Sequence, residues 1–252
     1  MTGKEKNDLI SFLKEDEIKN INLLNFMEAY PVVSLERVGD SVLMRGKSDC
    51  LWTYLSSPNE KDLEGVLARL TPDDRTFAAI EDWMLPALTR GRKLSWHLSM
   101  IRLILPEEHA LPKKPLPHIA PLSPDEGDYI YRHSLYQRLT NPDYIRGCIR
   151  QGPSAGIRES GELVAWLMTQ DDGSLGVLHV LDGHRGKGYA YDLTVHLAER
   201  IRATGRIPFV HVEETNAKSM SLALKVGFRQ DRRLHWLKIE PEGASAGSGD
   251  YC

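Results

Sequence analysis

The sequence has little cysteine and no long apolar segment. Only three cysteines occur in 252 residues, Cys50, Cys148 and Cys252, and they form no Cys-x-x-Cys pair. This spacing predicts neither a disulfide framework nor a thiolate zinc site. The charged N-terminus is followed by no apolar run, so the sequence predicts neither a secretion signal nor a membrane span. We therefore expect a cytoplasmic protein that does not act at a membrane and binds no metal.

An excess of charge of one sign is also missing. The chain has 32 Lys+Arg against 35 Asp+Glu, a net charge of -3. This balance argues against a nucleic-acid partner or a general binder of anionic surfaces. What is present, 41% hydrophobic and 27% charged residues, is typical of a globular protein. The length favours two domains over one.

Prolines mark the boundary between the expected domains. Six of them lie between Pro106 and Pro124, and proline excludes both helix interiors and central strands. We predict an N-terminal α/β domain over 1–106, a linker over 107–117 and a second domain over 118–240. The Gly- and Ser-rich residues 241–252 are expected to be a disordered tail.

Apolar periodicity and turn residues predict the elements of both domains. In the first domain they predict helices over 17–30, 60–70 and 76–90, and strands over 32–38, 41–45 and 96–105. In the second they predict strands over 118–122, 155–159, 163–170, 175–181, 209–213 and 234–239, with helices starting at 123 and spanning 141–151, 189–204 and 217–226. The second domain should therefore be a mixed sheet with helices packed on it.

A glycine-rich loop, Asp182–Ala190, joins an apolar strand to an amphipathic helix. Its glycines permit positive φ and close backbone approach, and a helix N-terminus presents free N–H groups to an anion. The loop has neither the Gly-Lys-Ser/Thr of a P-loop nor the spacing of a dinucleotide fold. Phosphate binding and a plain turn are about equally compatible with these features alone.

The loop also resembles a known family. Arg185-Gly-Lys-Gly-Tyr-Ala190 is similar to the Arg/Gln-x-x-Gly-x-Gly/Ala signature of the GNAT N-acyltransferase superfamily, and the order of elements from His118 to Ile239 is similar too. Residues 207–219 and 225–228 resemble the glycine N-acyltransferase-like (FR47-like) branch. The resemblance implies an α/β (α+β) fold with a mixed twisted sheet and helices on both faces. The smaller N-terminal α/β domain could be a degenerate copy of it.

What the resemblance implies chemically is transfer of an acetyl or other acyl group from acyl-coenzyme A to a primary amine. The acceptor would be a small-molecule amine or amino acid in preference to a protein amine. Cofactor contacts would come from a strand, the loop and the next helix: Leu178, His179, Val180, Arg185, Gly186, Lys187, Gly188, Tyr189, Ala190, Asn216 and Ser219. The Val180 N–H would polarise the thioester carbonyl, because donors aimed at a developing oxyanion are a large catalytic contribution.

The sequence departs from the family at two catalytic places. Ser174 stands where many relatives have a glutamate base, and Ala223 stands where many have a tyrosine acid. Candidate replacement bases are His179, His211 and Glu213, each of which could instead be structural.

Other residues leave alternatives open. His235 and Trp236 could line the acceptor pocket or belong to the core, and Cys148 is expected to be buried rather than to carry an acyl group. A catalytically degenerate acyl-coenzyme A-binding regulator, or a nucleotide-binding protein, would use the same loop.

Overall fold

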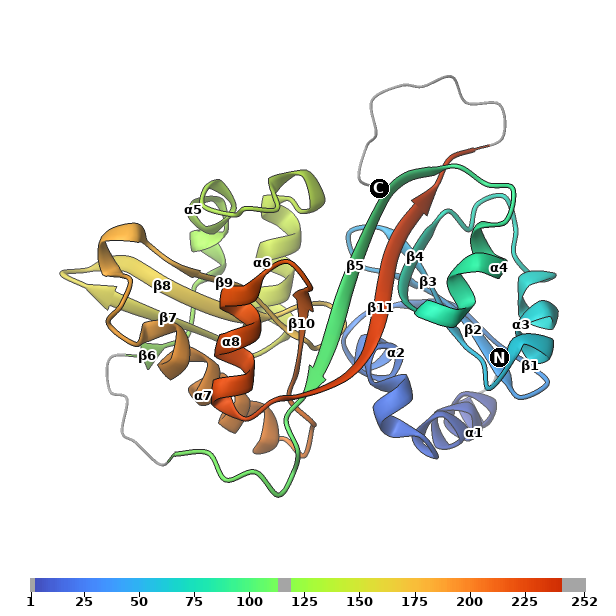
Figure 1. Ribbon diagram of the computed structural model, residues 1–252, viewed down its shortest axis with the longest axis horizontal. Coiled ribbons are helices and arrows are strands. Elements are labelled where there is room, and N and C mark those ends of the chain that lie inside the picture. Colours follow the sequence, from blue (N-terminus) through green and yellow to red (C-terminus); the bar gives the residue numbers. More distant parts are fainter. Residues whose placement is uncertain (1–2, 113–118, 242–252) are drawn as a thin grey trace. The chain divides into compact units, whose positions relative to one another are not determined.

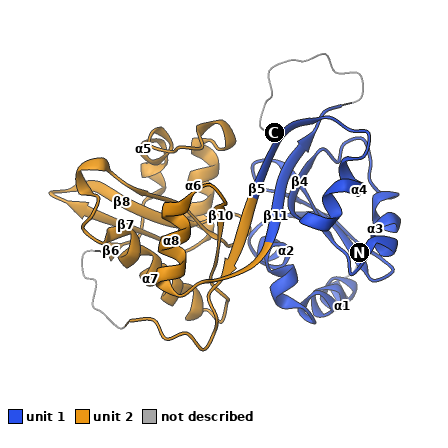
Figure 2. Cartoon of the chain, viewed as in Figure 1, with its two compact units in different colours: residues 1–99, 233–252 blue, residues 100–232 orange. Residues whose placement is uncertain are grey.

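The computed structural model describes residues 3–112 and 119–241, and the chain divides into two compact units (Figures 1 and 2). Unit 1 comprises residues up to 99 together with those from 233 onward, and unit 2 comprises 100–232. This division differs from the predicted boundary at 106 and from the assignment of 234–239 to the second domain. The predicted linker lies partly, and the predicted tail almost entirely, outside the described residues.

Unit 1 combines two N-terminal helices with a mainly antiparallel sheet. Its elements are α1 (Gly3–Lys14), α2 (Glu17–Ala29), β1 (Val32–Val38), β2 (Ser41–Lys47), β3 (Leu51–Ser56), α3 (Glu60–Leu67), β4 (Thr76–Glu81), a 3-10 turn (Asp82–Met84) and α4 (Leu85–Thr89). The strands follow the order β1-β2-β3-β4-β11, where β11 is Arg229–Ile239, and β3 runs parallel to β4. The predicted strands over 32–38 and 41–45 are confirmed and pair as an antiparallel hairpin, whereas α1 and β3 had not been predicted.

The predicted helix over 76–90 is wrong. Its first part is strand β4, and helix forms again at Leu85 after the 3-10 turn. Phe77, Ala78 and Ile80 are all buried, so β4 has the continuous apolar run of a central strand rather than the alternation of an edge. Such a short run cannot be told from a helix by periodicity.

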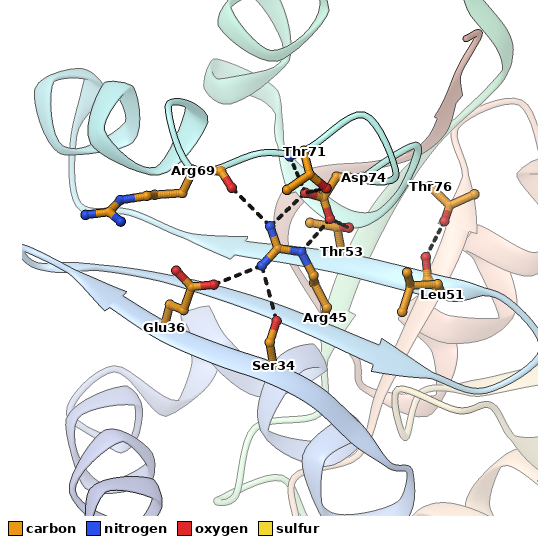
Figure 3. Close-up of polar contacts among 9 residues, drawn as sticks. All are labelled: Ser34, Glu36, Arg45, Leu51, Thr53, Arg69, Thr71, Asp74 and Thr76. Atoms are coloured by element: carbon orange, nitrogen blue, oxygen red, sulfur yellow. Dashed lines mark hydrogen bonds and ion pairs between the residues drawn. The ribbon is translucent and has the colours of Figure 1, made fainter. Parts of the chain in front are cut away.

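A polar cluster fixes one side of the unit 1 sheet (Figure 3). Arg45 on β2 forms a two-point ion pair with Asp74, with Nε to Oδ1 at 2.6 Å and Nη2 to Oδ2 at 2.7 Å. Asp74 is 3% exposed and also accepts hydrogen bonds from Thr53 and Thr71. Burial alone would raise the pKa of Asp74, but the hydrogen bonds from Arg45 and Thr71 outweigh it and lower that pKa.

Unit 2 is a sheet with helices on both faces. Its elements are β6 (Ile119–Ala120), α5 (Gly127–Arg132), α6 (Pro142–Gln151), β7 (Ser154–Glu159), β8 (Glu162–Thr169), β9 (Leu175–Val180), α7 (Tyr189–Arg202), β10 (Phe209–Glu213) and α8 (Ala217–Val226), with 3-10 turns at Pro124–Glu126, Gln137–Leu139 and Asp182–His184. The strand order is β5-β10-β9-β8-β7-β6. Helices α7 and α8 pack on one face of this sheet, and α5 and α6 pack on the other face (Figure 1). Each pair of helices forms its own apolar cluster with the sheet. The predicted fold class is confirmed.

The two units repeat one order of elements and exchange their last strands. In each, an antiparallel hairpin continues into a third strand, a helix leads to a fourth, parallel strand, and a second helix follows. The next strand along the chain then pairs in the other unit. Residues 100–104 of β5 (Leu94–Ile104) pair with β10, and β11 (Arg229–Ile239) pairs through residues 234–238 with β4. This repetition supports the expectation that the N-terminal half is a copy of the same fold.

Two further features concern compartment and cysteine. Among residues 3–112 and 119–241, no helix is long and apolar enough to cross a membrane. Cys148 is a free, buried thiol on α6, as expected. Cys50 is disulfide-bonded, which the cysteine spacing did not predict.

Candidate functional site

Strand β9 separates from its parallel neighbour soon after it begins. Among the described residues, Leu175 opposite Val210 is the one pair between β9 and β10. On its other edge β9 pairs with β8 from Leu175 to Val180, with an irregularity opposite Leu167. Val177 lies at this irregularity with φ +57°, a value uncommon for a branched residue. A bulge bends and twists the strand that carries it, and in β9 it follows directly after the pair with β10.

Alternate peptide groups at the end of β9 face the edge that β10 leaves. The Leu181 N–H donates to the Val164 carbonyl on β8, with N and O 3.0 Å apart. Because peptide groups alternate along a strand, the Val180 N–H points to the opposite edge. Leu178, His179 and Val180 are half-buried there, after the last pair with β10.

The glycine-rich loop opens the next helix without a side-chain cap. Gly186 and Gly188 have φ +80° and +88°, and Gly188 is the N-cap residue of α7. A Cβ at either glycine would meet nothing within 4 Å, so their backbone faces open space. The first N–H groups of a helix have no acceptor within the helix. This arrangement fits an anionic group with several phosphate oxygens.

The corresponding helix of unit 1 has the opposite character. Helix α3 follows β3 as α7 follows β9, but Asn59 caps it by accepting from the Asp62 N–H at 3.0 Å. Glu60 and Asp62 add negative charge in its first turn. An anion would be repelled there, so the two copies of the fold differ where phosphate could bind.

Glu159, at the end of β7, contacts the loop and was not singled out from the sequence. Its carboxylate accepts hydrogen bonds from the Lys187 ammonium at 2.9 Å and from the Tyr189 hydroxyl, and His184 lies 3.3 Å away. The hydrogen bond from Tyr189, followed by that from Lys187, lowers the pKa of Glu159 to about 2. Lys187 is therefore neutralised within the chain. Arg185 is held by Asp182 at 2.7 Å and by the Val180 carbonyl.

Three positions considered for acid–base chemistry are closed to a substrate. Ser174 is fully buried, and its hydroxyl donates to Asp172 at 2.6 Å. Ala223 is buried and has no titratable group. The His211 side chain is 4% exposed and lies 3.7 Å from Asp172. Burial lowers the pKa of His211 to about 4 although Asp172 opposes this.

Glu213 and Asn216 lie at the end of β10, where they contact Tyr136. Burial, then the hydrogen bond to Glu213, raises the pKa of Tyr136 to about 12, and Asn216 also hydrogen-bonds this phenol. Asn216 caps α8 by accepting from the Ser219 N–H at 3.1 Å. Tyr136 was missed because it is distant in sequence and lies in a segment without a periodic pattern.

His179 lies on the sheet face covered by α5 and α6. Its ring stacks on Trp166, with centroids 4.8 Å apart and planes 20° apart. His133, at the end of α5, meets the edge of the same tryptophan at 5.8 Å. Burial, with smaller contributions from His133 and Arg185, lowers the pKa of His179, while Asp182 acts in the opposite direction.

His235 and Trp236 belong to unit 1, whereas the β9–β10 edge belongs to unit 2. His235 is 3% exposed, with Nε2 2.9 Å from Asp82 and Nδ1 2.9 Å from His97. Trp236 packs against the apolar core of unit 1. Of the two interpretations, acceptor pocket or core, the structure therefore supports the core for both residues.

Comparisons with known proteins agree with this geometry. Residues 154–237 match the family model described as FR47-like protein. A Drosophila protein of known structure has a TM-score of 0.77 at 16% identity, covering 96% of this chain and 98% of its own. A GCN5-related N-acetyltransferase-like protein from Streptococcus suis has a TM-score of 0.55 at 11% identity, with coverages of 91% and 98%.

A third structure gives the same result. The GCN5-related N-acetyltransferase from Kribbella flavida has a TM-score of 0.55 at 12% identity, with coverages of 88% and 94%. No curated protein matches the chain. The protein therefore has the fold of the GNAT acetyltransferases. Within it, the FR47-like match extends from β7 to residue 237 in β11.

Proposed function

We propose that the protein is an N-acyltransferase that moves an acetyl or other acyl group directly from acyl-coenzyme A to a primary amine. One observation carries the proposal: an uncapped helix N-terminus follows a strand whose end no longer pairs with its parallel neighbour. The first feature suits a pyrophosphate, and the second suits an extended amide-bearing arm that pairs with a strand edge. The FR47-like match supports the same reaction class.

Different groups of the chain would bind different parts of acyl-coenzyme A. Backbone N–H groups from Arg185 to Ala190 would bind the pyrophosphate, and the free edge of β9 at Leu178 and His179 would bind the pantetheine arm. The Val180 N–H points to that edge and would donate to the thioester carbonyl as negative charge develops on its oxygen. Asn216 and Ser219, at the start of α8, would border the arm. Holding the amine against the thioester supplies much of the remaining rate enhancement.

A second candidate is an acyl-coenzyme A-binding regulator without turnover. One observation favours it. Ser174 and Ala223 are both buried, and neither supplies an acid or base to a substrate. Both candidates require the same ligand and differ only in turnover.

Calorimetric titration with acetyl-coenzyme A, coenzyme A and ATP tests the ligand. The variant Gly188→Glu places a negative side chain at the loop. Gly205→Glu is the matched control, because Gly205 has φ +76°, equally open surroundings and a position just after the other end of α7. We expect micromolar binding of the coenzyme A species that is lost in Gly188→Glu and kept in Gly205→Glu.

Three results would change the conclusion. Absence of binding would refute the assignment of the loop. Equal competition by ATP would favour a nucleotide-binding protein. Tight acyl-coenzyme A binding without turnover on a broad panel of amines would favour the regulator.

A further inference from the structure

The proposed reaction requires a group that removes a proton from the acceptor. A lysine-like amine, with a pKa near ~10.4, is an ammonium at neutral pH and cannot attack a carbonyl until it is deprotonated. Ser174 and His211 are buried, and Ala223 has no titratable group. Glu213, at the end of β10, is already hydrogen-bonded by the Tyr136 hydroxyl. The other titratable side chains near the site lie at the open end of β9 and on the elements that cover it.

Two histidines from distant parts of the chain contact one fully buried tryptophan. Trp166 on β8 has His179 stacked on its face and His133 at its edge. Tyr129, one helical turn before His133, packs edge-on against the same ring, with centroids 5.9 Å apart. Trp166 is 0% exposed, so both imidazoles pack against a ring that is itself enclosed by the core. The centroids of His133 and His179 are 6.0 Å apart, a separation that one bridging water can span.

The tautomer of His133 is set by the helix before it. Its Nδ1 lies 2.8 Å from the Tyr129 carbonyl oxygen. Because a carbonyl oxygen only accepts, Nδ1 must donate, and Nε2 of the neutral ring carries the lone pair. His133 is half-buried, so this nitrogen can exchange protons with water.

We propose that His133 and His179 form a proton-transfer pair on Trp166, in which His179 takes the proton from the acceptor ammonium and His133 passes it to solvent. This inference rests on the proposed function and names the acid–base groups of its site. The acceptor is thereby a protonated primary amine, which the pair converts to the free base.

The atoms balance without any further reactant. The ammonium loses one proton to His179, which transfers it through a water to His133 and then to bulk solvent. The free amine nitrogen forms the amide C–N bond as the thioester C–S bond breaks. The second proton leaves that nitrogen and ends on the departing sulfur, which gives the free thiol.

The charged groups around His179 affect its protonation. Burial lowers its pKa, Arg185 and a protonated His133 act in the same direction, and Asp182 opposes them. The lowered pKa favours the neutral ring, which is the form that can accept a proton. Removing the His133 ring should therefore move the titration midpoint of His179 upward.

The first test needs no knowledge of the acceptor. The ring signals of isotope-labelled histidine are followed by NMR in the full chain as pH is varied, in wild type and in His133→Asn. Asparagine can still donate to the Tyr129 carbonyl but cannot titrate. We expect the His179 midpoint to rise, because the His133 charge that lowers its pKa is removed while the burial of His179 remains. An unchanged midpoint would overturn the pairing, and His133→Gln gives the same comparison if the asparagine variant does not fold.

His196→Asn is the matched control. His196 lies on α7 in the same unit, and burial lowers its pKa as it does for His179. It contacts neither Trp166 nor the loop in any interaction of the described residues. Its replacement should leave the His179 midpoint, turnover and acyl-coenzyme A affinity unchanged.

The second test measures turnover on an amine panel against pH. We expect kcat/KM to fall ~10²-fold or more in His179→Asn. In His133→Asn we expect a fall of about tenfold and an acid limb displaced to higher pH, following the raised pKa of His179. Added imidazole should partly restore the rate of His133→Asn. In both variants, acyl-coenzyme A affinity measured by calorimetry should stay within a few-fold of wild type.

The failures of the two proposals are distinguishable. If wild type acylates amines while His133→Asn keeps the full rate and an unmoved pH profile, the proton-transfer pair is refuted and the proposed function stands. If wild type binds acyl-coenzyme A but acylates no amine, both are refuted in favour of the regulator.

Discussion

Replacing Asp74 by alanine should destabilise unit 1 severely. Asp74 accepts from Arg45 Nε and Nη2, the Thr71 N–H, the Thr71 hydroxyl and the Thr53 hydroxyl at 2.6–3.2 Å. Without it, the Arg45 side chain, which is 12% exposed, keeps Glu36 at 3.0 Å as its one charged partner among the described residues (Figure 3). Removing one partner of a buried ion pair costs about 3–5 kcal/mol, chiefly because the remaining charge stays buried. We expect a loss in that range in the free energy of unfolding.

Urea unfolding followed by tryptophan fluorescence measures this loss. Asp40→Asn is the control, because Asp40 forms a comparable ion pair with Arg37 that is exposed on both sides, at 69% and 45%. Exposed pairs contribute about 0–1 kcal/mol. If Asp74→Ala cost no more than Asp40→Asn, the Arg45 cluster would not be the stabilising element described here.

The same cluster gives a pH dependence of definite sign. The pKa of Asp74 is lowered in the folded state, so the unfolded chain binds its proton at higher pH than the folded protein does. The contribution is fully present above the unfolded value near ~3.9 and is lost as pH falls through the folded value. The difference in unfolding free energy between wild type and Asp74→Asn should shrink when pH is lowered from 6 toward 3.

Three further outcomes follow from the site and the strand exchange. Glu159→Gln should release Lys187 and tighten acyl-coenzyme A binding a few-fold, with a steeper salt dependence of the affinity. The control Glu162→Gln, on the same hairpin, should leave the affinity unchanged. Weaker binding in Glu159→Gln would show that Glu159 mainly positions the loop. A fragment of residues 118–240 lacks β5 and should not fold, while 100–232 should retain more native circular dichroism; a native-like 118–240 fragment would contradict the exchange. Calorimetry should give one site per chain, and two sites would contradict the charge argument for α3.

Local patterns were sufficient for most of unit 2. The hairpin of β7 and β8, strands β9 and β10 and helices α7 and α8 all lie where apolar periodicity and glycines predict them. The loop at Gly186 and Gly188 was predictable because positive φ favours glycine, and closely spaced glycines before an amphipathic helix are visible in the sequence.

Pairing between distant segments was not predictable in the same way. The continuous apolar run of β4 is ambiguous between strand and helix, and only its position between β3 and β11 decides it. Nothing local specifies that β5 and β11 pair in opposite units, since a strand edge accepts any complementary strand. Glu159, Tyr136 and His133 were missed for the same reason, because each acquires its partners through tertiary contacts.

The two copies of the fold show how the same helix start can serve stability or binding. In unit 1, the Asn59 side chain satisfies the Asp62 N–H of α3 within the chain, the acids of the first turn add negative charge, and an N-cap of this kind contributes about 1 kcal/mol. In unit 2, α7 begins at Gly188 without such a side-chain cap, and a Cβ at Gly188 would meet open space. An uncapped start lowers the stability of the free protein, but it leaves donors that an anionic ligand can satisfy. Binding specificity therefore follows from a change of a few residues between strand and helix, while the surrounding fold is repeated.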